Sequence, residues 1–168
     1  MIKAIPEGYQ AVTAHLVLAC ADSAIKFYRH ALGAIELYRL RLRNGEIAHA
    51  ELMIGNSRIM VSDDAAEQGA KSARGYGGSP TVLCIYTHDV ARLAERFLEA
   101  GGTIVRAIKD QFYGDRSGLF QDPEGYRWTL AQHIEDVRPE EMARRIASLR
   151  PSEVEPPTLC TASAGSRR

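Results

Sequence analysis

The sequence predicts an α+β protein made of two βαβββ modules. The order of elements is the first observation: a strand, a helix and three strands are expected within 12–63, and the same order returns within 80–133. An Asn-Gly turn at 44–45 between two alternating runs is the second, because this dipeptide is the strongest short signal of a β-hairpin. The third is an internal offset of 69 residues, which places Gly33 on Gly102 at the end of each expected helix.

The first module is expected to occupy residues 8–63. Its first strand, VTAHLVLAC at 12–20, is rich in β-branched and apolar residues. The helix follows at 22–33, where apolar side chains recur at helical spacing and Asp22 or Ser23 is the expected N-cap. Three more strands are then expected, separated by short turns that contain glycine, at 35–42, 46–54 and 57–63.

A connection rich in Gly, Ala and Ser at 64–79 separates the modules. The second module is expected at 80–134 and repeats the strand, helix and three strands of the first. After it we expect a short amphipathic helix at 135–150. The last segment, 151–168, is rich in Pro, Ser, Thr and Ala, which predicts a disordered tail.

The charge composition argues against nucleic acids and anionic membranes as partners. The 168 residues include 21 Lys plus Arg and 21 Asp plus Glu, so the formal net charge is zero. Nucleic acids and anionic membranes require a basic surface, and neither is an expected partner. Three cysteines far apart indicate reduced thiols and a cytoplasmic protein. No apolar run reaches transmembrane length, and the N-terminal stretch lacks the apolar region of a signal peptide.

Five stretches of the sequence resemble one protein family. They are IPEGYQAVTAHLVL, AIKFYRHALGA, EIAHAELMIGNSRIMVSD, DQFYGDR and DPEGYRWTLAQHIEDV, within roughly residues 5–150. These stretches are similar to the PhnB-like glyoxalase/bleomycin-resistance branch of the vicinal oxygen chelate superfamily. The resemblance implies that the two modules form an eight-strand cavity and that the protein is a homodimer. It implies no single reaction, because this fold hosts metal-dependent lyases, dioxygenases and metal-free drug binders.

The same resemblance gives four positions for metal ligands, on the first and last strands of the modules. These positions are Thr13, Met60, Val82 and Thr129. A divalent metal of this kind is bound by imidazole nitrogen or carboxylate oxygen. Val82 offers no donor atom and Met60 offers only a thioether, so we expect no metal ion at these positions and no cofactor.

Strand alternation predicts which side chains line the cavity. In strand 46–54 the alanines, Leu and Ile form an apolar face, so His49 and Glu51 turn to the other side, which His15 shares. A histidine beside a carboxylate suits proton abstraction near neutral pH, which makes His49, Glu51 and His15 acid–base candidates. The same three residues could instead form a displaced metal site, or be hydrogen-bonded residues of a solvated pocket or a dimer interface.

The remaining candidates are residues expected to contact a bound molecule. They are Thr13, Met60, Tyr86, Tyr113, Arg116 and Thr129. Tyr113 and Arg116 belong to 110–121, where a family cavity opens, and would cover a polar ligand. Alternatively, Asp115 and Arg116 pair with neighbouring residues and hold a hairpin. The DPEG sequence at 122–125 is expected to be a turn, since proline presets φ and glycine accepts a left-handed conformation.

Two classes of function follow. The first is a protein that binds or sequesters a small, partly apolar organic molecule without a divalent metal. The second is an enzyme, which is either metal-independent with His49 and Glu51 as acid–base groups, or a metal-dependent lyase or dioxygenase with ligands at His15, His49 and Glu51.

Overall fold

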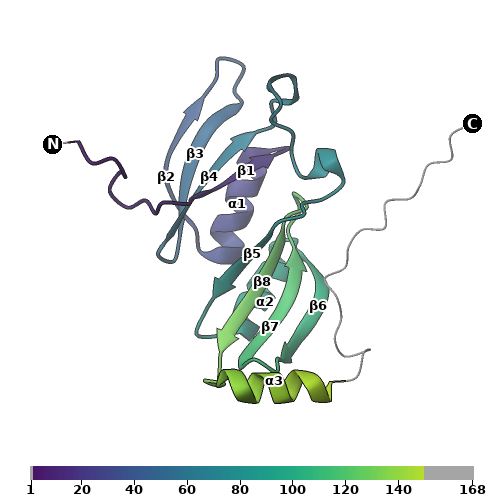
Figure 1. Ribbon diagram of the computed structural model, residues 1–168. Coiled ribbons are helices and arrows are strands. Elements are labelled where there is room, and N and C mark those ends of the chain that lie inside the picture. The colour runs from purple at the N-terminus through teal and green to yellow at the C-terminus, as the bar shows by residue number, and fades with distance from the viewer. Residues whose placement is uncertain (1, 150–168) are drawn as a thin grey trace, which may run out of the picture.

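The computed structural model describes residues 2–149, and the expected tail at 151–168 lies outside them. The first module forms a four-stranded sheet with strand order β1-β4-β3-β2 and a helix on one face (Figure 1). Strand β1 runs parallel to β4, and the other neighbours are antiparallel. The elements are β1 (Ala14–Leu18), α1 (Ala21–Leu32), β2 (Ile35–Arg41), β3 (Ile47–Ile54) and β4 (Ser57–Asp63).

The second module repeats this arrangement with strand order β5-β8-β7-β6. Its elements are β5 (Val82–Tyr86), α2 (Val90–Glu99), β6 (Thr103–Asp110), β7 (Asp115–Gln121) and β8 (Arg127–His133). The connection between the modules contains the short 3-10 helices η1 (Ala66–Gln68) and η2 (Arg74–Tyr76), and α3 (Pro139–Ser148) follows β8. The predicted α+β fold of two βαβββ modules with a short C-terminal helix is therefore confirmed. Within residues 2–149, no helix is long and apolar enough to cross a membrane.

The two helices form the main contact between the modules. Phe27 of α1 packs against Phe97 of α2 with ring centroids 5.0 Å apart. Tyr28 of α1 packs against Trp128 of β8 with ring centroids 5.7 Å apart. Each sheet therefore has one face on the shared apolar core and a second face directed away from its helix. We call this second face the outer face.

The DPEG turn also joins the modules. The carboxylate of Asp122 accepts hydrogen bonds from Tyr28 Oη at 2.8 Å and from Trp128 Nε1 at 2.9 Å. Glu124 accepts a hydrogen bond from the backbone N–H of Ala19 at 2.6 Å. Both carboxylates are almost fully buried. The segment is a turn, as predicted. Its two carboxylates also accept hydrogen bonds from Tyr28 and Ala19, and in this way connect the second module to the first.

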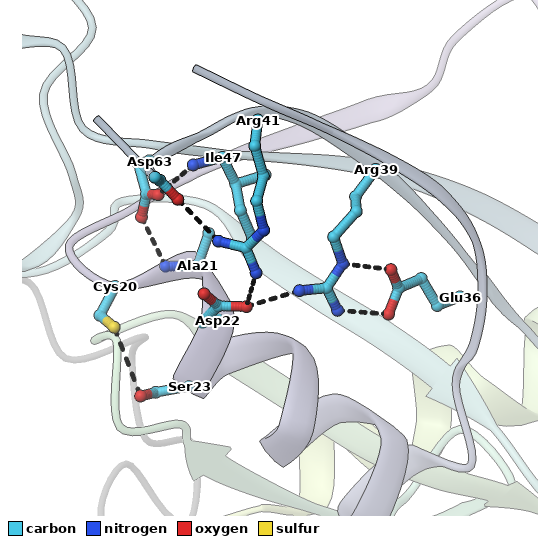
Figure 2. A network of polar contacts seen from close by, with 10 residues as sticks. Cys20, Ala21, Asp22, Ser23, Glu36, Arg39, Arg41, Ile47 and Asp63 are labelled. Carbon is cyan, nitrogen blue, oxygen red and sulfur yellow. Dashed lines mark hydrogen bonds and ion pairs between the residues drawn. The ribbon is translucent and has the colours of Figure 1, made fainter. Parts of the chain in front are cut away.

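The start of α1 differs from the prediction. The helix begins at Ala21, whose backbone N–H donates to Asp63 Oδ1 at 2.6 Å (Figure 2). The prediction that Asp22 or Ser23 is the N-cap is therefore wrong, because a carboxylate from the end of β4 accepts a first-turn N–H. Asp22 instead binds two arginines of β2, Arg39 at 2.5 Å and Arg41 at 2.7 Å.

Candidate functional site

Four of the predicted site residues, His15, His49, Glu51 and Met60, lie on the outer face of the first sheet. In the strand register, Met60 of β4 lies between His15 of β1 and Glu51 of β3, and Tyr38 of β2 lies next to Glu51. His49 lies two residues before Glu51 and therefore on the same face. The structure thus brings His15, His49 and Glu51 together, as alternation predicted.

Glu51 is the centre of a dense set of hydrogen bonds, although its side chain is only 1% exposed. The Tyr38 hydroxyl donates to Glu51 Oε1 at 2.5 Å, and the Tyr9 hydroxyl donates to the same oxygen. The Arg58 guanidinium donates to Oε2, and His49 Nε2 lies 3.4 Å from Oε1. Burial raises the pKa of Glu51, but the hydrogen bonds from Tyr38, Tyr9, Arg58 and His49 lower it to about 2. We call these five residues the Glu51 centre.

This pKa decides what Glu51 can do chemically. A carboxylate with a pKa of about 2 holds almost no proton near neutral pH and is a weak general base there. The hydrogen bond to Glu51 raises the pKa of Tyr38 to about 12, so that phenol stays neutral. The arrangement therefore suits a fixed anion that positions Arg58 and two hydroxyl groups, rather than a group that exchanges protons.

His49 of this centre and the neighbouring His15 are better placed for proton transfer than Glu51. Their ring centroids lie 6.0 Å apart, and His15 Nε2 lies 3.1 Å from Ser62 Oγ. Burial, together with the neighbouring His49, lowers the pKa of His15. His15 is therefore a neutral imidazole near pH 7 and able to accept a proton.

The outer face of the second sheet carries a smaller set of polar residues around Asp115, which is 5% exposed. Tyr86 Oη donates to Asp115 Oδ2 at 2.7 Å, and His133 Nδ1 lies 2.8 Å from Oδ1. His133 Nε2 lies 3.0 Å from Asp136 Oδ1. The bond to Asp115 raises the pKa of Tyr86 to about 12, and the bonds to Asp115 and Asp136 raise the pKa of His133. We call Asp115, Tyr86 and His133 the Asp115 centre.

A groove of about 400 Å³ lies between the edge strands β1 and β5. Thr13 and Cys84 line it, together with Arg58 of the Glu51 centre and Tyr86 of the Asp115 centre. Burial and the nearby Asp115 raise the pKa of Cys84, so this thiol is not an activated nucleophile. The groove thus adjoins both polar centres and contains two of the predicted contact residues, Thr13 and Tyr86.

The other predicted contact residues lie in different places. Thr129 lies between Cys84 and Leu119 on the outer face of the second sheet. Tyr113 Oη lies 3.4 Å from Ser117 Oγ. Arg116 alternates with Asp115 along β7, lies on the opposite face and binds the exposed Asp110 at 2.6 Å. The structure therefore separates Arg116 from the other candidates.

Sequence reasoning missed two members of the Glu51 centre, Tyr9 and Tyr38. Alternation along 35–42 could have identified Tyr38, because β2 pairs with β3 and places this tyrosine opposite Glu51. Tyr9 precedes the first strand, in a segment with no periodic pattern, so no local signal could have identified it.

The donors available on the outer faces do not fit a divalent metal. None of the four positions implied by the resemblance offers an imidazole or a carboxylate, since they are occupied by Thr13, Met60, Val82 and Thr129. Glu51, the carboxylate of the displaced alternative, already accepts hydrogen bonds on both oxygens. Within residues 2–149, no three side chains of His, Cys, Asp or Glu are arranged to hold a metal ion.

Comparison with known proteins points to the same superfamily as the sequence resemblance. A model of the Glyoxalase/Bleomycin resistance protein/Dioxygenase superfamily matches residues 13–130. The uncharacterized protein Rv0887c of Mycobacterium tuberculosis is 38% identical over 141 residues, which cover 82% of this chain and 83% of the relative.

Solved structures show the same fold at lower identity. The product of Arabidopsis thaliana gene At5g48480 is 24% identical, with a TM-score of 0.60 over 73% of this chain and 98% of that one. The PhnB protein of Bacillus cereus is 16% identical, with a TM-score of 0.58 over 73% of this chain and 99% of that one.

Proposed function

Since the chain belongs to the Glyoxalase/Bleomycin resistance protein/Dioxygenase superfamily, we propose that it binds a small, partly apolar organic molecule between its modules without a divalent metal. The superfamily resemblance drawn from the sequence is confirmed, and the structural neighbours include a PhnB protein. The fold alone does not decide between a binding protein and an enzyme, so the proposal depends on the site.

The observation that carries the proposal is the wall of the groove. Arg58, fixed on buried Glu51, and Tyr86, fixed on buried Asp115, both line it. Apolar residues such as Val12 and Ile85 line another part of the groove, and Thr13 and Asn56 add further polar groups. A groove of about 400 Å³ with an apolar wall and a few fixed polar groups has the properties of a small-molecule site. The ligand would place its apolar part on the wall and a hydrogen-bonding group at Arg58 or Tyr86.

A screen of small organic acids, amines and aromatic compounds by thermal unfolding tests this proposal. Ligands that raise the melting temperature are then titrated with and without EDTA, against the wild type, Thr13→Val, Tyr86→Phe and the control Lys109→Met. We expect a Kd that EDTA leaves unchanged, and a three- to tenfold weaker Kd, as a rough figure for one lost hydrogen bond, in the two groove variants.

Elemental analysis of the purified protein separates this proposal from the metal-dependent alternative. We expect far less than one divalent metal per chain, because the donor set does not fit one. About one Zn, Ni or Fe per chain, lost on mutation of His15 or His49, would establish the metal enzyme with ligands at His15, His49 and Glu51 instead.

A metal-independent enzyme is the second candidate function. The observation that favours it is the pair of imidazoles, His15 and His49, which lie side by side on the same outer face. If a screened compound is turned over, His15→Gln and His49→Gln should lower kcat and leave the Kd nearly unchanged. Equal loss of binding and turnover in both variants would make these histidines contact residues only.

We also propose that the protein is a cytoplasmic homodimer. Large apolar or aromatic side chains stay exposed on both outer faces: Tyr38, Leu40, Val82 and Tyr86. A second copy of the chain would cover them. Sedimentation at micromolar concentration is expected to give twice the 18.5 kDa of one chain, and a monomer alone would remove this part of the proposal. The free thiols of Cys20 and Cys84 suit a reducing compartment.

A further inference from the structure

A second and larger cavity, of about 730 Å³, lies between β1 and the connection that joins the modules. We propose that this cavity binds a small amphipathic organic anion, with its acid group at Lys71 and its apolar body between Tyr76 and the edge of β1. Its walls are mainly apolar, from Ala14, Leu16, Ala73, Pro80 and Leu83. The proposal does not depend on the ligand of the groove, because the walls supplied by the connection belong to this cavity alone.

Lys71 is the charge that would recognise the anion. Its Nζ lies 5.0 Å from the centroid of the Tyr76 ring, a cation–π contact at the wall of the cavity. Among the residues that the structure describes, no carboxylate forms a salt bridge with Lys71. The ammonium group therefore keeps donors available for an acid group on a ligand.

Gly75 leaves the space in which the Lys71 side chain lies. A Cβ at this position would come within 2.7 Å of Lys71 Cε and 2.9 Å of its Cγ. The backbone of Gly75 is not left-handed, so its conformation does not require glycine. The absence of a side chain at Gly75 allows the aliphatic part of Lys71 to pack against η2 and places its ammonium group near the Tyr76 ring.

The wall that carries Lys71 and Tyr76 is held in place. Asp64 Oδ2 accepts the backbone N–H of Ser72 at 2.7 Å, and Ser72 Oγ accepts that of Gly75 at 3.2 Å. The backbone N–H of Ser79 donates to Gly125 of the DPEG turn at 3.4 Å. Because this wall is ordered before a ligand binds, binding loses little conformational entropy, which favours affinity for a small ligand.

The opposite wall is equally fixed. Tyr126 Oη accepts the backbone N–H of Val17 at 3.1 Å and donates to the Val17 carbonyl at 3.0 Å. This ring therefore covers the free edge of β1 and forms part of the cavity lining. The position between two modules and the volume both match the usual properties of a ligand pocket.

Two fluorescent probes of similar shape test the assignment. One is 8-anilinonaphthalene-1-sulfonate, an aromatic anion, and the other is N-phenyl-1-naphthylamine, which has the same rings and no charge. The full chain is titrated with each probe as the wild type, Lys71→Met, Gly75→Ala, Tyr86→Phe and the control Lys109→Met. Lys71→Met keeps the length of the stem and removes only the charge.

We expect Lys71→Met to weaken the sulfonate about tenfold and to leave the neutral probe unchanged, since one charge-assisted contact is lost. Gly75→Ala should weaken the sulfonate less, because the flexible lysine can move, and Lys109→Met should have no effect. Equal affinity of the sulfonate for wild type and Lys71→Met would overturn the proposal. Loss in Tyr86→Phe alone would place the probe in the groove and would also overturn it, while leaving the proposed function intact.

Discussion

The outer faces of the two sheets differ in how they balance a buried carboxylate. On the first sheet, Glu51 is bound by Arg58, whose charge does not change with pH in the physiological range. On the second sheet, Asp115 is bound by Tyr86, a neutral phenol, and by His133, which is charged only when protonated. The Glu51–Arg58 pair thus keeps a constant charge near neutral pH, whereas the Asp115–His133 pair becomes more negative as pH rises through the pKa of His133.

Because of this difference, the Glu51 centre is a rigid scaffold and the Asp115 centre is an adjustable surface. Four donors hold Glu51, so the position of Arg58 at the groove is fixed as long as Glu51 stays ionised. Asp115 has two side-chain partners, and both of them are largely exposed. A ligand group or a change in pH can therefore alter the Asp115 centre more easily than the Glu51 centre.

Replacing Glu51 by Ala should have the largest effect. The change leaves Arg58, Tyr9 and Tyr38 without their shared acceptor, and we expect it to lower the free energy of unfolding by about 2–3 kcal/mol. Urea denaturation with circular dichroism measures the loss. Glu95→Ala, on the exposed side of α2, is the matched control and should stay within about 0.5 kcal/mol of wild type. A loss in Glu51→Ala no larger than in this control would show that the first face is not a rigid scaffold.

The corresponding change on the second sheet should cost less. In Asp115→Asn the amide oxygen still accepts from Tyr86, and only the charge-assisted contact with His133 is lost, so we expect a loss of about 1 kcal/mol. The same denaturation experiment measures it, with Asp110→Asn on the exposed rim of β6 as the control. If Asp115→Asn were as destabilising as Glu51→Ala, the two centres would be equivalent and the contrast would fail.

Much of this contrast could be predicted from local pattern. Alternation in strand 46–54 placed His49 and Glu51 on one face, because one side of a strand must meet its helix. The same rule applies to β8, where Trp128 and Leu130 lie on the core side and are buried. The fold class followed from the order of elements, and the structure confirms it.

What could not be predicted depends on contacts between distant segments. The N-cap of α1 was assigned to Asp22 or Ser23 from their neighbours, whereas Asp63, about 40 residues later, binds the first helical N–H. His49 and Glu51 were predicted to be acid–base candidates because their side chains share one face of the strand. The low pKa of Glu51 comes from hydrogen bonds donated by Tyr38, Tyr9 and Arg58. No strand periodicity specifies the approach of Tyr9, which lies before β1.

Removing one donor from the Glu51 centre should have a smaller effect than removing the acceptor. Tyr38→Phe deletes one hydrogen bond to Glu51 and leaves those from Tyr9, Arg58 and His49. The pKa of Glu51 should rise from about 2 toward its ordinary value, because a bond to the ionised form is lost. Carboxyl carbon NMR during acid titration measures the change, with Tyr113→Phe as control. An unchanged pKa would mean that Arg58 alone sets the charge of the centre.

The smallest expected effect is on the pH dependence of stability. It tests the contrast most directly, because Glu51 and His133 make stability change with pH in opposite directions. The pKa of Glu51 is lowered on folding, so its contribution to stability is present above its ordinary pKa of 4.5 and is lost as pH falls toward 2. The pKa of His133 is raised by Asp115 and Asp136, so its contribution is complete below 6.5 and is lost as pH rises through the folded-state pKa.

Denaturation midpoints of wild type and His133→Gln, measured across this range, should therefore converge at alkaline pH and separate in mildly acidic solution. Asp115→Asn should reduce that separation, because it removes the main cause of the raised pKa. The half-exposed imidazole keeps the effect small, so the comparison needs midpoints from parallel titrations in the same buffers. Parallel curves for wild type and His133→Gln at all pH values would show that protonation of His133 does not balance Asp115, and the contrast between the two centres would fail.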